Sequence, residues 1–183
     1  MKELSLNILD ITYNSIKAEA SRIDIELSES LSKNLVEICI RDNGCGMDEE
    51  FLPRVTDPFV TTRTTRKVGL GIPLFKQSAE DTDGSFSIRS KVGEGTEIKA
   101  SFRLDHLDRA PIGDMGSTMI SLIQANDRIR FVYRHQTDSG SFVLDTEELH
   151  EQLGDIPLST PEVLSWIGEY VAENLEEIQG GKV

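Results

Sequence analysis

The chain has 183 residues, of which 38% are apolar and 28% charged, a composition typical of one globular domain with or without a small extension. Its formal net charge is −13, so phosphate repulsion excludes nucleic acid and anionic membrane surfaces as partners. No stretch approaches the roughly 20 apolar residues of a membrane span, and no apolar signal sequence follows Met1, so we expect a cytoplasmic protein.

The negative charge is concentrated after residue 105. Residues 1–105 hold 14 Lys and Arg against 18 Asp and Glu, whereas residues 106–183 hold 5 against 14. The acidic second part therefore suits either a basic partner protein or simple solubility. Cys39 and Cys45 have no further cysteine with which to build a metal site, and we expect both to be reduced thiols.

Apolar spacing in residues 1–105 predicts three helices and four strands. Apolar residues recur at helical intervals near the N-terminus and then alternate with polar residues at Ile23, Ile25 and Leu27, as in a half-buried strand. The predicted helices cover residues 3–20, 47–55 and 71–81, and the predicted strands cover residues 23–28, 35–40, 85–89 and 96–104. This order predicts an α/β (α+β) two-layer sandwich with helices on one face of a mixed sheet.

Residues 110–116 are expected to be a linker to a small α+β extension. Its predicted helices cover residues 119–125, 146–153 and 161–178, and a predicted hairpin joins residues 129–134 to 141–144. Thr160 is expected to cap the last helix, which has Pro161 at its first position. We therefore divide the chain into residues 1–105 and an acidic region, residues 106–183, to which the sequence assigns no role.

Three polar side chains share one face of the first predicted helix. Asp10, Asn14 and Lys17 are spaced at i, i+4 and i+7, so a carboxylate, an amide and an ammonium project together. An amide oxygen is a ligand for Mg²⁺, an ammonium can meet a phosphate, and a carboxylate can orient or deprotonate water. A solvated helix face is the alternative for this pattern taken alone.

A short polar turn, Asp42-Asn43-Gly44-Cys45-Gly46, follows directly after a predicted strand. An Asp at a strand end can accept a hydrogen bond from an exocyclic amine such as that of adenine, and glycines let the backbone approach a flat ring. A plain turn is the alternative, since Asn-Gly is common in turns. Cys45 would make binding sensitive to oxidation, or it is a small filler between two glycines.

Two further patterns are rich in glycine. Residues 57–72 combine threonines and three cations with Gly69-Leu70-Gly71, which opens a helix, and helix N-termini are natural phosphate sites. The stretch is neither a P-loop nor a dinucleotide fingerprint, because neither spacing occurs, and a mobile surface loop is the alternative. Gly93-Glu94-Gly95-Thr96 precedes the last strand and taken alone is a hairpin turn.

These four patterns, in this order, resemble the GHKL superfamily of gyrase B subunits, heat-shock chaperone ATPases, histidine kinases and mismatch-repair ATPases. The resemblance covers about residues 1–105 and is closest to the histidine-kinase ATP-binding domain, here without a phosphoacceptor-histidine dimerisation domain. It implies ATP and Mg²⁺ as cofactors and a nucleotide lying between a sheet-side turn and a lid. The implied roles are Mg²⁺ ligand for Asn14, phosphate contact for Lys17, adenine recognition for Asp42 with Gly44 and Gly46, lid for Thr61 to Lys67 including Thr62, phosphate cradle for Gly69, Leu70 and Gly71, and the adenine end of the pocket for Thr96.

The chain departs from that family pattern in several places. Asp10 stands where hydrolysing members have a glutamate general base, and Lys67 stands where many histidine kinases have glycine. The chain begins at the Asn14 helix, so either the sheet ends early or residues 106–183 complete it. Three histidines, His106, His135 and His150, all follow the ATP-binding part and are interpreted as surface or structural residues.

Three functions stay open at this point. The first is a kinase-like transfer of phosphate to a partner protein, as in the anti-sigma-factor serine kinases of the superfamily. The second is an ATP-driven switch with slow hydrolysis and no phosphotransfer, in which ATP orders the lid and changes the surface shown to a partner. The third is a module that binds a partner and no nucleotide. A homodimer also stays open.

Overall fold

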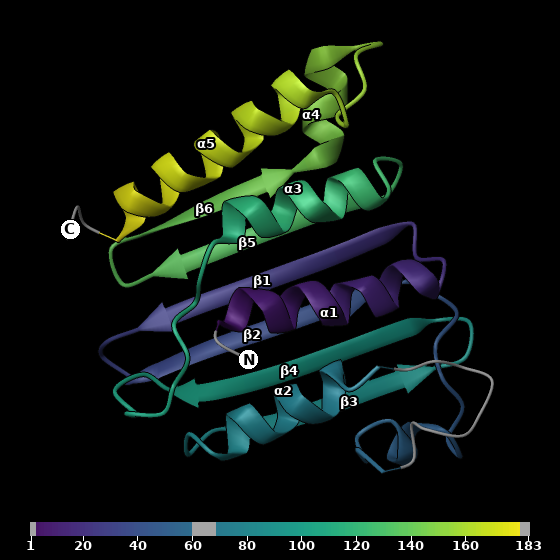
Figure 1. Ribbon diagram of the computed structural model, residues 1–183, viewed down its shortest axis with the longest axis vertical. Coiled ribbons are helices and arrows are strands. Elements are labelled where there is room, and N and C mark those ends of the chain that lie inside the picture. Colours follow the sequence, from purple (N-terminus) through teal and green to yellow (C-terminus); the bar gives the residue numbers. More distant parts are fainter. Residues whose placement is uncertain (1–2, 60–68, 180–183) are drawn as a thin grey trace.

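The computed structural model describes residues 3–59 and 69–179. One six-stranded sheet, in the order β3-β4-β2-β1-β5-β6, carries a layer of helices on one of its faces (Figure 1). The elements are α1 (Leu4–Lys17), β1 (Arg22–Ser30), β2 (Leu35–Asp42), the 3₁₀ helix η1 (Leu52–Arg54), α2 (Gly71–Glu80), β3 (Ser85–Lys91), β4 (Gly95–Arg103), α3 (Met115–Ala125), β5 (Arg130–Thr137), β6 (Gly140–Asp145), α4 (Thr146–Leu153) and α5 (Pro161–Ile178).

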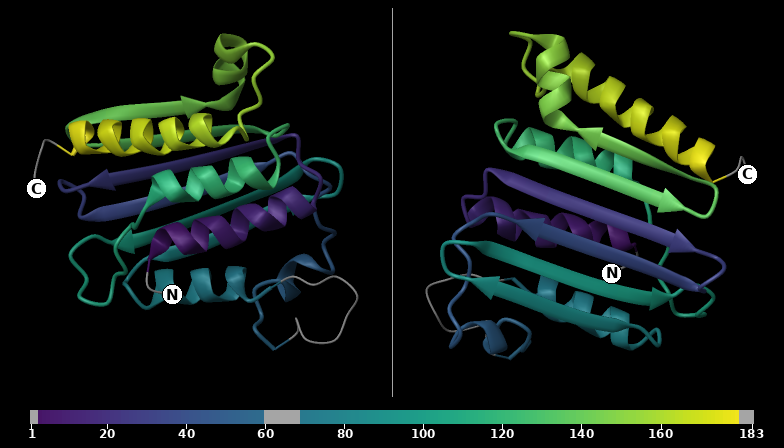
Figure 2. Two further views of the ribbon diagram at one scale, coloured as in Figure 1. Left: turned by 45° about the horizontal axis from the view of Figure 1, so that its top comes forward. Right: turned by 180° about the vertical axis from the view of Figure 1, so that it is seen from behind.

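The sheet is mixed, as the sequence predicts. β1 and β2 form an antiparallel hairpin, β4 pairs antiparallel with both β2 and β3, and β5 pairs antiparallel with β6. Only the β1–β5 pairing is parallel within the described part of the chain. The helices lie over one face of this sheet, so the predicted two-layer sandwich is confirmed (Figure 2).

Residues after 105 complete the sheet. β5 lies beside β1, with Ile23 opposite Phe131 and Ile25 opposite Tyr133, and all four side chains are buried. Of the two expectations for the sheet, early ending and completion by residues 106–183, the structure has the second. One hydrophobic core therefore runs from α2 and β4 to α5 and β6 across residue 105.

Strand alternation decides which face is covered. Ile23, Ile25 and Leu27 point toward the helices and are buried, whereas Asp24 and Glu26 point to the opposite face. No described helix covers that opposite face, which is seen from behind in Figure 2. We call it the open face. None of the described helices is both long enough and apolar enough to cross a bilayer.

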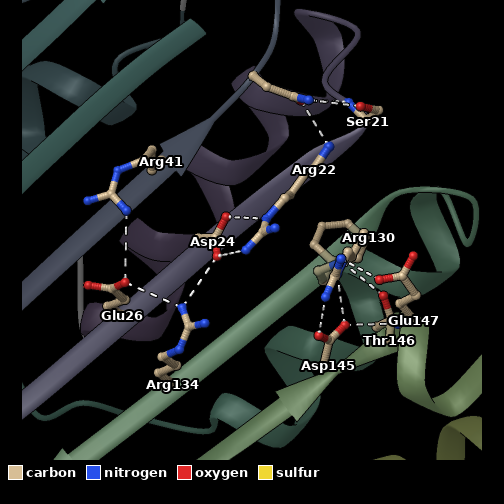
Figure 3. A network of polar contacts seen from close by, with 12 residues as sticks. Ser21, Arg22, Asp24, Glu26, Arg41, Arg130, Arg134, Asp145, Thr146 and Glu147 are labelled. Carbon is tan, nitrogen blue, oxygen red and sulfur yellow. Dashed lines mark hydrogen bonds and ion pairs between the residues drawn. The ribbon is translucent and has the colours of Figure 1, made fainter.

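Ion pairs join the charged side chains in the middle of the open face (Figure 3). Asp24 accepts two hydrogen bonds from Arg22, at 2.8 and 2.9 Å, and also lies 3.4 Å from Arg134. Arg41 pairs with Glu97 of the neighbouring strand at 2.9 Å. The hydrogen bond from Arg22, together with both positive charges, outweighs burial and lowers the pKa of Asp24.

Two predicted helices in the first part are longer than the real ones. The first helix stops at Lys17 instead of residue 20, because Glu19 takes a left-handed backbone with φ of 58° and the Ala20 N–H bonds back to the Ser15 carbonyl. In the expected helix 47–55 only the 3₁₀ turn Leu52–Arg54 forms. There the Asp48 carboxylate accepts from the Phe51 N–H, as a helix cap does, but Pro53 has no N–H with which to continue an α-helical hydrogen-bond ladder, and only the short turn forms.

The second part contains two smaller differences. α3 begins at Met115, inside the expected linker, because the Asp114 carboxylate caps it by accepting from the Ser117 N–H at 2.9 Å. Thr160 does occupy the N-cap position of α5, but its hydroxyl bonds to the Pro157 carbonyl instead of to the helix. The predicted hairpin, realised as β5 and β6, is confirmed.

Candidate functional site

A cavity of about 500 Å³ opens between α1, the end of β2 and the start of α2. The residues that line it combine apolar side chains with a small number of polar groups. They are Ile11, Asn14, Ser15, Lys17, Ala18, Ile40, Asp42, Cys45, Gly46, Met47, Phe51, Val55, Ile72, Thr96 and Ile98. An apolar cavity with convergent polar groups is the usual form of a small-molecule site.

Asp42 is held rigidly at the end of β2. One carboxylate oxygen accepts a hydrogen bond from the Ser15 hydroxyl at 2.6 Å, and the other accepts from the Gly44 N–H at 2.9 Å. Each oxygen of a carboxylate can accept about two hydrogen bonds. Asp42 is therefore oriented by α1 and by its own turn while it keeps acceptor capacity for a ligand.

Thr96 lies directly opposite Asp42 in the pairing of β4 with β2. Its hydroxyl is 2.8 Å from that of Ser90, which in turn accepts from the Met47 N–H at 2.8 Å. The Gly93 N–H also donates to the Cys45 carbonyl at 2.8 Å. The β3–β4 hairpin and the turn after β2 are thus joined by hydrogen bonds at one end of the cavity.

The glycines of the turn allow this close packing of protein segments. Gly46 has a left-handed backbone with φ of 70°, and a Cβ added there would lie 2.0 Å from the Lys91 carbonyl oxygen. A Cβ at Gly44 would lie 2.7 Å from the Ala18 carbonyl oxygen. Glycine at both positions is therefore required by the neighbouring backbone, whatever binds in the cavity.

The polar helix face of α1 lies along the cavity. Asn14 and Lys17 line it, and neither side chain has a hydrogen-bond or ion-pair partner among the described residues. Asp10 lies one turn earlier, next to the start of α2, where a Cβ at Gly71 would be 3.2 Å from the Asp10 Cβ. α2 has no side-chain cap within the described residues, so N–H groups of its first turn stay available.

The structure thus brings five of the predicted site residues into one cavity lining, with others close by. Asn14, Lys17, Asp42, Gly46 and Thr96 line one cavity. Gly44 supports the turn behind it, and Gly69, Leu70 and Gly71 lead into the helix whose Ile72 completes the lining. Asp10 lies beside that helix start and is not part of the lining. Thr61, Thr62 and Lys67, and with them the expected lid, lie outside the described residues.

Two serines that position these groups were missed by reasoning from the sequence. Ser15 is buried and holds Asp42, and Ser90 joins Thr96 to the turn. A signal for Ser15 existed, because it continues the buried stripe of α1 through Ile8 and Ile11. A hydroxyl in such a stripe needs a hydrogen-bond partner. Ser90 carried no comparable signal, since it lies next to a hairpin turn.

Sequence comparison identifies relatives that share about half of the chain or somewhat more. A putative sensor protein of Shewanella frigidimarina (strain NCIMB 400) is 31% identical over 109 residues, which are 59% of this chain and 16% of that protein. A probable C4-dicarboxylate sensor kinase of Bacillus subtilis (strain 168) is 31% identical over 91 residues, which are 50% of this chain and 17% of that one. The shared region is therefore only a small part of each relative.

Structure comparison supports the fold over a longer range. The crystal structure of the N-terminal domain of a DNA repair protein matches with a TM-score of 0.51 at 15% identity, covering 79% of this chain and 53% of that one. Residues 2–106 match the model of the family described as histidine kinase-, DNA gyrase B-, and HSP90-like ATPase. Since that match covers more than half of the chain, the protein belongs to this family of ATP-binding domains.

Proposed function

We propose that the chain binds ATP with Mg²⁺ in the cavity beside α1 and transfers the terminal phosphate to a residue of a partner protein. One observation carries the proposal. Asp42, fixed by two internal hydrogen bonds, lies in the same cavity as Asn14 and Lys17, which have no partner among the described residues. This supports the proposal, because an acceptor of the kind that adenine needs and polar groups of the kind that phosphate needs share one cavity.

The polar groups of α1 fit a magnesium nucleotide. The Asn14 amide would supply an oxygen ligand of the kind Mg²⁺ prefers, beside the oxygens of the nucleotide. When bound, Mg²⁺ supplies positive charge that offsets the phosphates. Lys17, one turn along the same helix face, would add a second positive charge, and the uncapped start of α2 would offer N–H groups.

The acceptor of the phosphate belongs on another molecule in this proposal. All three histidines of the chain have structural partners: His135 is buried between Tyr133 and Glu29, His150 lies 3.0 Å from the Asp127 carbonyl oxygen, and His106 lies near Asp83. His106 comes after Arg103, at the opposite end of β4 from Thr96. At roughly 3.4 Å per residue, Thr96 and Arg103 lie about 24 Å apart. None of the three is placed to receive phosphate in the cavity.

A second function, an ATP-driven switch without phosphotransfer, is favoured by the way the helices pack. α1 carries the cavity residues and contacts α3, and α3 packs against α5. A shift of α1 on nucleotide binding would therefore reach the acidic C-terminal region through contiguous contacts. This function predicts nucleotide-dependent association with a partner and no phosphorylated product.

Calorimetric titration with Mg²⁺ and ATP tests the shared pocket. In Asp42→Asn the side chain can still accept from the Gly44 N–H and donate to the Ser15 hydroxyl, so the fold should persist. The amide replaces one acceptor oxygen and the negative charge with a donor group, which weakens the bond to the adenine amine, and we expect affinity to fall by about 10- to 100-fold. Unchanged ATP affinity in a folded variant would mean that ATP does not bind at Asp42, and the proposed pocket would be wrong.

Radiolabelled ATP then separates the two functions. Phosphotransfer predicts label on a partner protein, whereas the switch predicts release of inorganic phosphate alone. Asp10→Ala should keep nucleotide affinity and lose hydrolysis if Asp10 is the general base, and normal turnover in that variant would reject the role. A chain that binds no ATP while folded would instead support the third, nucleotide-independent function.

A further inference from the structure

The outer face of α5 carries the exposed Trp166, which lies against the half-buried Tyr170 and among glutamates. Trp166 is 46% exposed, and its ring stacks on that of Tyr170 with centroids 4.9 Å apart and planes 11° from parallel. At 100° per residue, the same helix stripe holds four glutamates. They are Glu162, Glu169, Glu173 and Glu177. We call these six residues the α5 stripe.

No cation within the described residues balances the α5 stripe. α5 contains no Lys or Arg, and none of its four stripe glutamates has an ion-pair partner among residues 3–59 and 69–179. The other indole face of Trp166 likewise has no described aromatic or cationic neighbour. Among the described residues, the stripe therefore has no counter-charge of its own.

This charge arrangement works against the helix itself. Glu169 and Glu173, and again Glu173 and Glu177, are like charges at i and i+4, which repel. Glu173 and Glu177 also lie near the C-terminal end of α5, where the helix dipole disfavours negative charge and the last turn holds no basic residue. A bound cation would relieve both kinds of repulsion at once.

We infer that the α5 stripe binds an arginine-bearing segment of a partner protein. A guanidinium group can stack on an exposed indole and form paired hydrogen bonds with carboxylates, and the stripe offers both. Charge complementarity selects this occupant, because phosphate backbones and anionic lipid surfaces would be repelled. A second copy packed face to face would set glutamate against glutamate.

The inference does not depend on nucleotide binding. α5 lies at the β6 end of the sheet, whereas the cavity lies near α2 and β4 at the other end (Figure 1). The partner surface and the proposed ATP pocket can therefore be tested separately on the same 183-residue chain, each with the other site intact.

The test uses a synthetic peptide of alternating Arg and Ala as the probe, at near-physiological salt, with and without Mg²⁺ and ATP. Trp166 is the only tryptophan of the chain, so its fluorescence reports contact with the stripe directly. We expect saturable binding with a change in Trp166 emission, and weaker binding of a Lys-Ala peptide of equal charge, because lysine cannot stack as a plane.

Two triple variants with the same change in charge supply the control. Glu162→Gln, Glu169→Gln and Glu173→Gln together should weaken binding by about tenfold, since three ion pairs are lost. Glu37→Gln, Glu80→Gln and Asp81→Asn alter exposed carboxylates that have no described ion-pair partner and lie away from α5. This second triple should leave affinity unchanged.

Three results would overturn the inference. Equal weakening of peptide binding in both triple variants would mean that the net charge of the protein alone explains the binding. Unchanged Trp166 emission on binding would place the peptide elsewhere. Equal affinity for the Arg and Lys peptides would mean that stacking on Trp166 does not contribute to binding, so the occupant would not be specifically arginine. Circular dichroism of each variant verifies that α5 stays folded.

Discussion

Polar side chains on the two sides of the sheet differ in whether they have partners inside the protein. On the open face, Asp24, Arg134 and Arg41 are joined to neighbours by ion pairs across the strands. On the helix-covered face, Asn14 and Lys17 line a cavity and have no such partner among the described residues. The open face of the sheet therefore carries paired charges, whereas α1, packed over the other face, presents unpaired polar groups to the cavity.

The difference separates residues that stabilise the fold from residues that are free to bind a ligand. A paired charge already has its electrostatic partner inside the protein, so its removal leaves the other partner exposed to a less favourable environment. An unpaired polar group at a cavity contributes little to folding. Asp42 combines both features, because it has internal donors in Ser15 and Gly44 and still faces the cavity.

The largest loss of stability is expected at Gly46. This residue is an exception to the separation above, since it lies at the cavity but is needed for the fold. In Gly46→Ala the left-handed backbone costs about 1–2 kcal/mol and the clash with the Lys91 carbonyl about as much again, so the free energy of unfolding should fall by about 3 kcal/mol. Chemical denaturation measures this change, and nucleotide affinity should fall with it because the turn carries Asp42.

Gly93→Ala is the matched control for that prediction. Gly93 has a similar φ of 79°, but a Cβ there meets no atom within 4 Å. Only the conformational cost applies, and we expect a loss of about 1–2 kcal/mol. Equal losses in the two variants would show that contact with Lys91 is unimportant.

The two-layer arrangement and several residues of the cavity could be predicted from the sequence, because both depend on local patterns. Apolar alternation in β1 and helical spacing in α1 follow directly from the positions of Ile23, Ile25, Ile8 and Ile11. The spacing of Asn14 and Lys17 likewise places both on one helix face.

What the sequence could not predict depends on contacts between distant segments. The pairing of β5 with β1 joins residues more than 100 positions apart, and no local pattern specifies that neighbour. The bond between Ser90 and Thr96 requires the hairpin register, and the Ser15–Asp42 bond requires α1 to lie over the end of β2. The Asp114 cap was missed because it lies in a stretch rich in Gly and Pro, which favours a linker.

The next largest effect is expected on the open face. In Asp24→Asn, Arg22 and Arg134 lose a carboxylate whose side chain is only 12% exposed, so the free energy of unfolding should fall by about 2 kcal/mol at neutral pH. Nucleotide affinity should not change, because Asp24 points away from the cavity. A loss of affinity without a loss of stability would reverse the roles assigned to the two faces.

The same variant should have a characteristic pH dependence. The hydrogen bond from Arg22 is the main reason why the pKa of Asp24 is lowered on folding, from an ordinary value of 3.8. A lowered pKa stabilises the folded state above the unfolded pKa, and that contribution disappears as pH falls through the folded pKa. The stability difference between wild type and Asp24→Asn should therefore be constant near pH 6–7 and narrow below about pH 4. Denaturation at several pH values measures it, and a difference that grows in acid would contradict the ion pair.

The smallest effect on stability is expected at Asn14, where we expect a change in ATP affinity that depends on Mg²⁺. Alanine is a better helix former than asparagine and Asn14 has no described partner to lose, so Asn14→Ala should keep or slightly raise stability, within about 0.5 kcal/mol. If Asn14 is a magnesium ligand, affinity for ATP should fall about tenfold with Mg²⁺ present and stay at the wild-type value with a chelator. Titrations under both conditions separate metal binding from nucleotide binding. An equal loss with and without Mg²⁺ would mean that Asn14 contacts the nucleotide itself, and a loss of stability would place Asn14 with the paired residues of the open face.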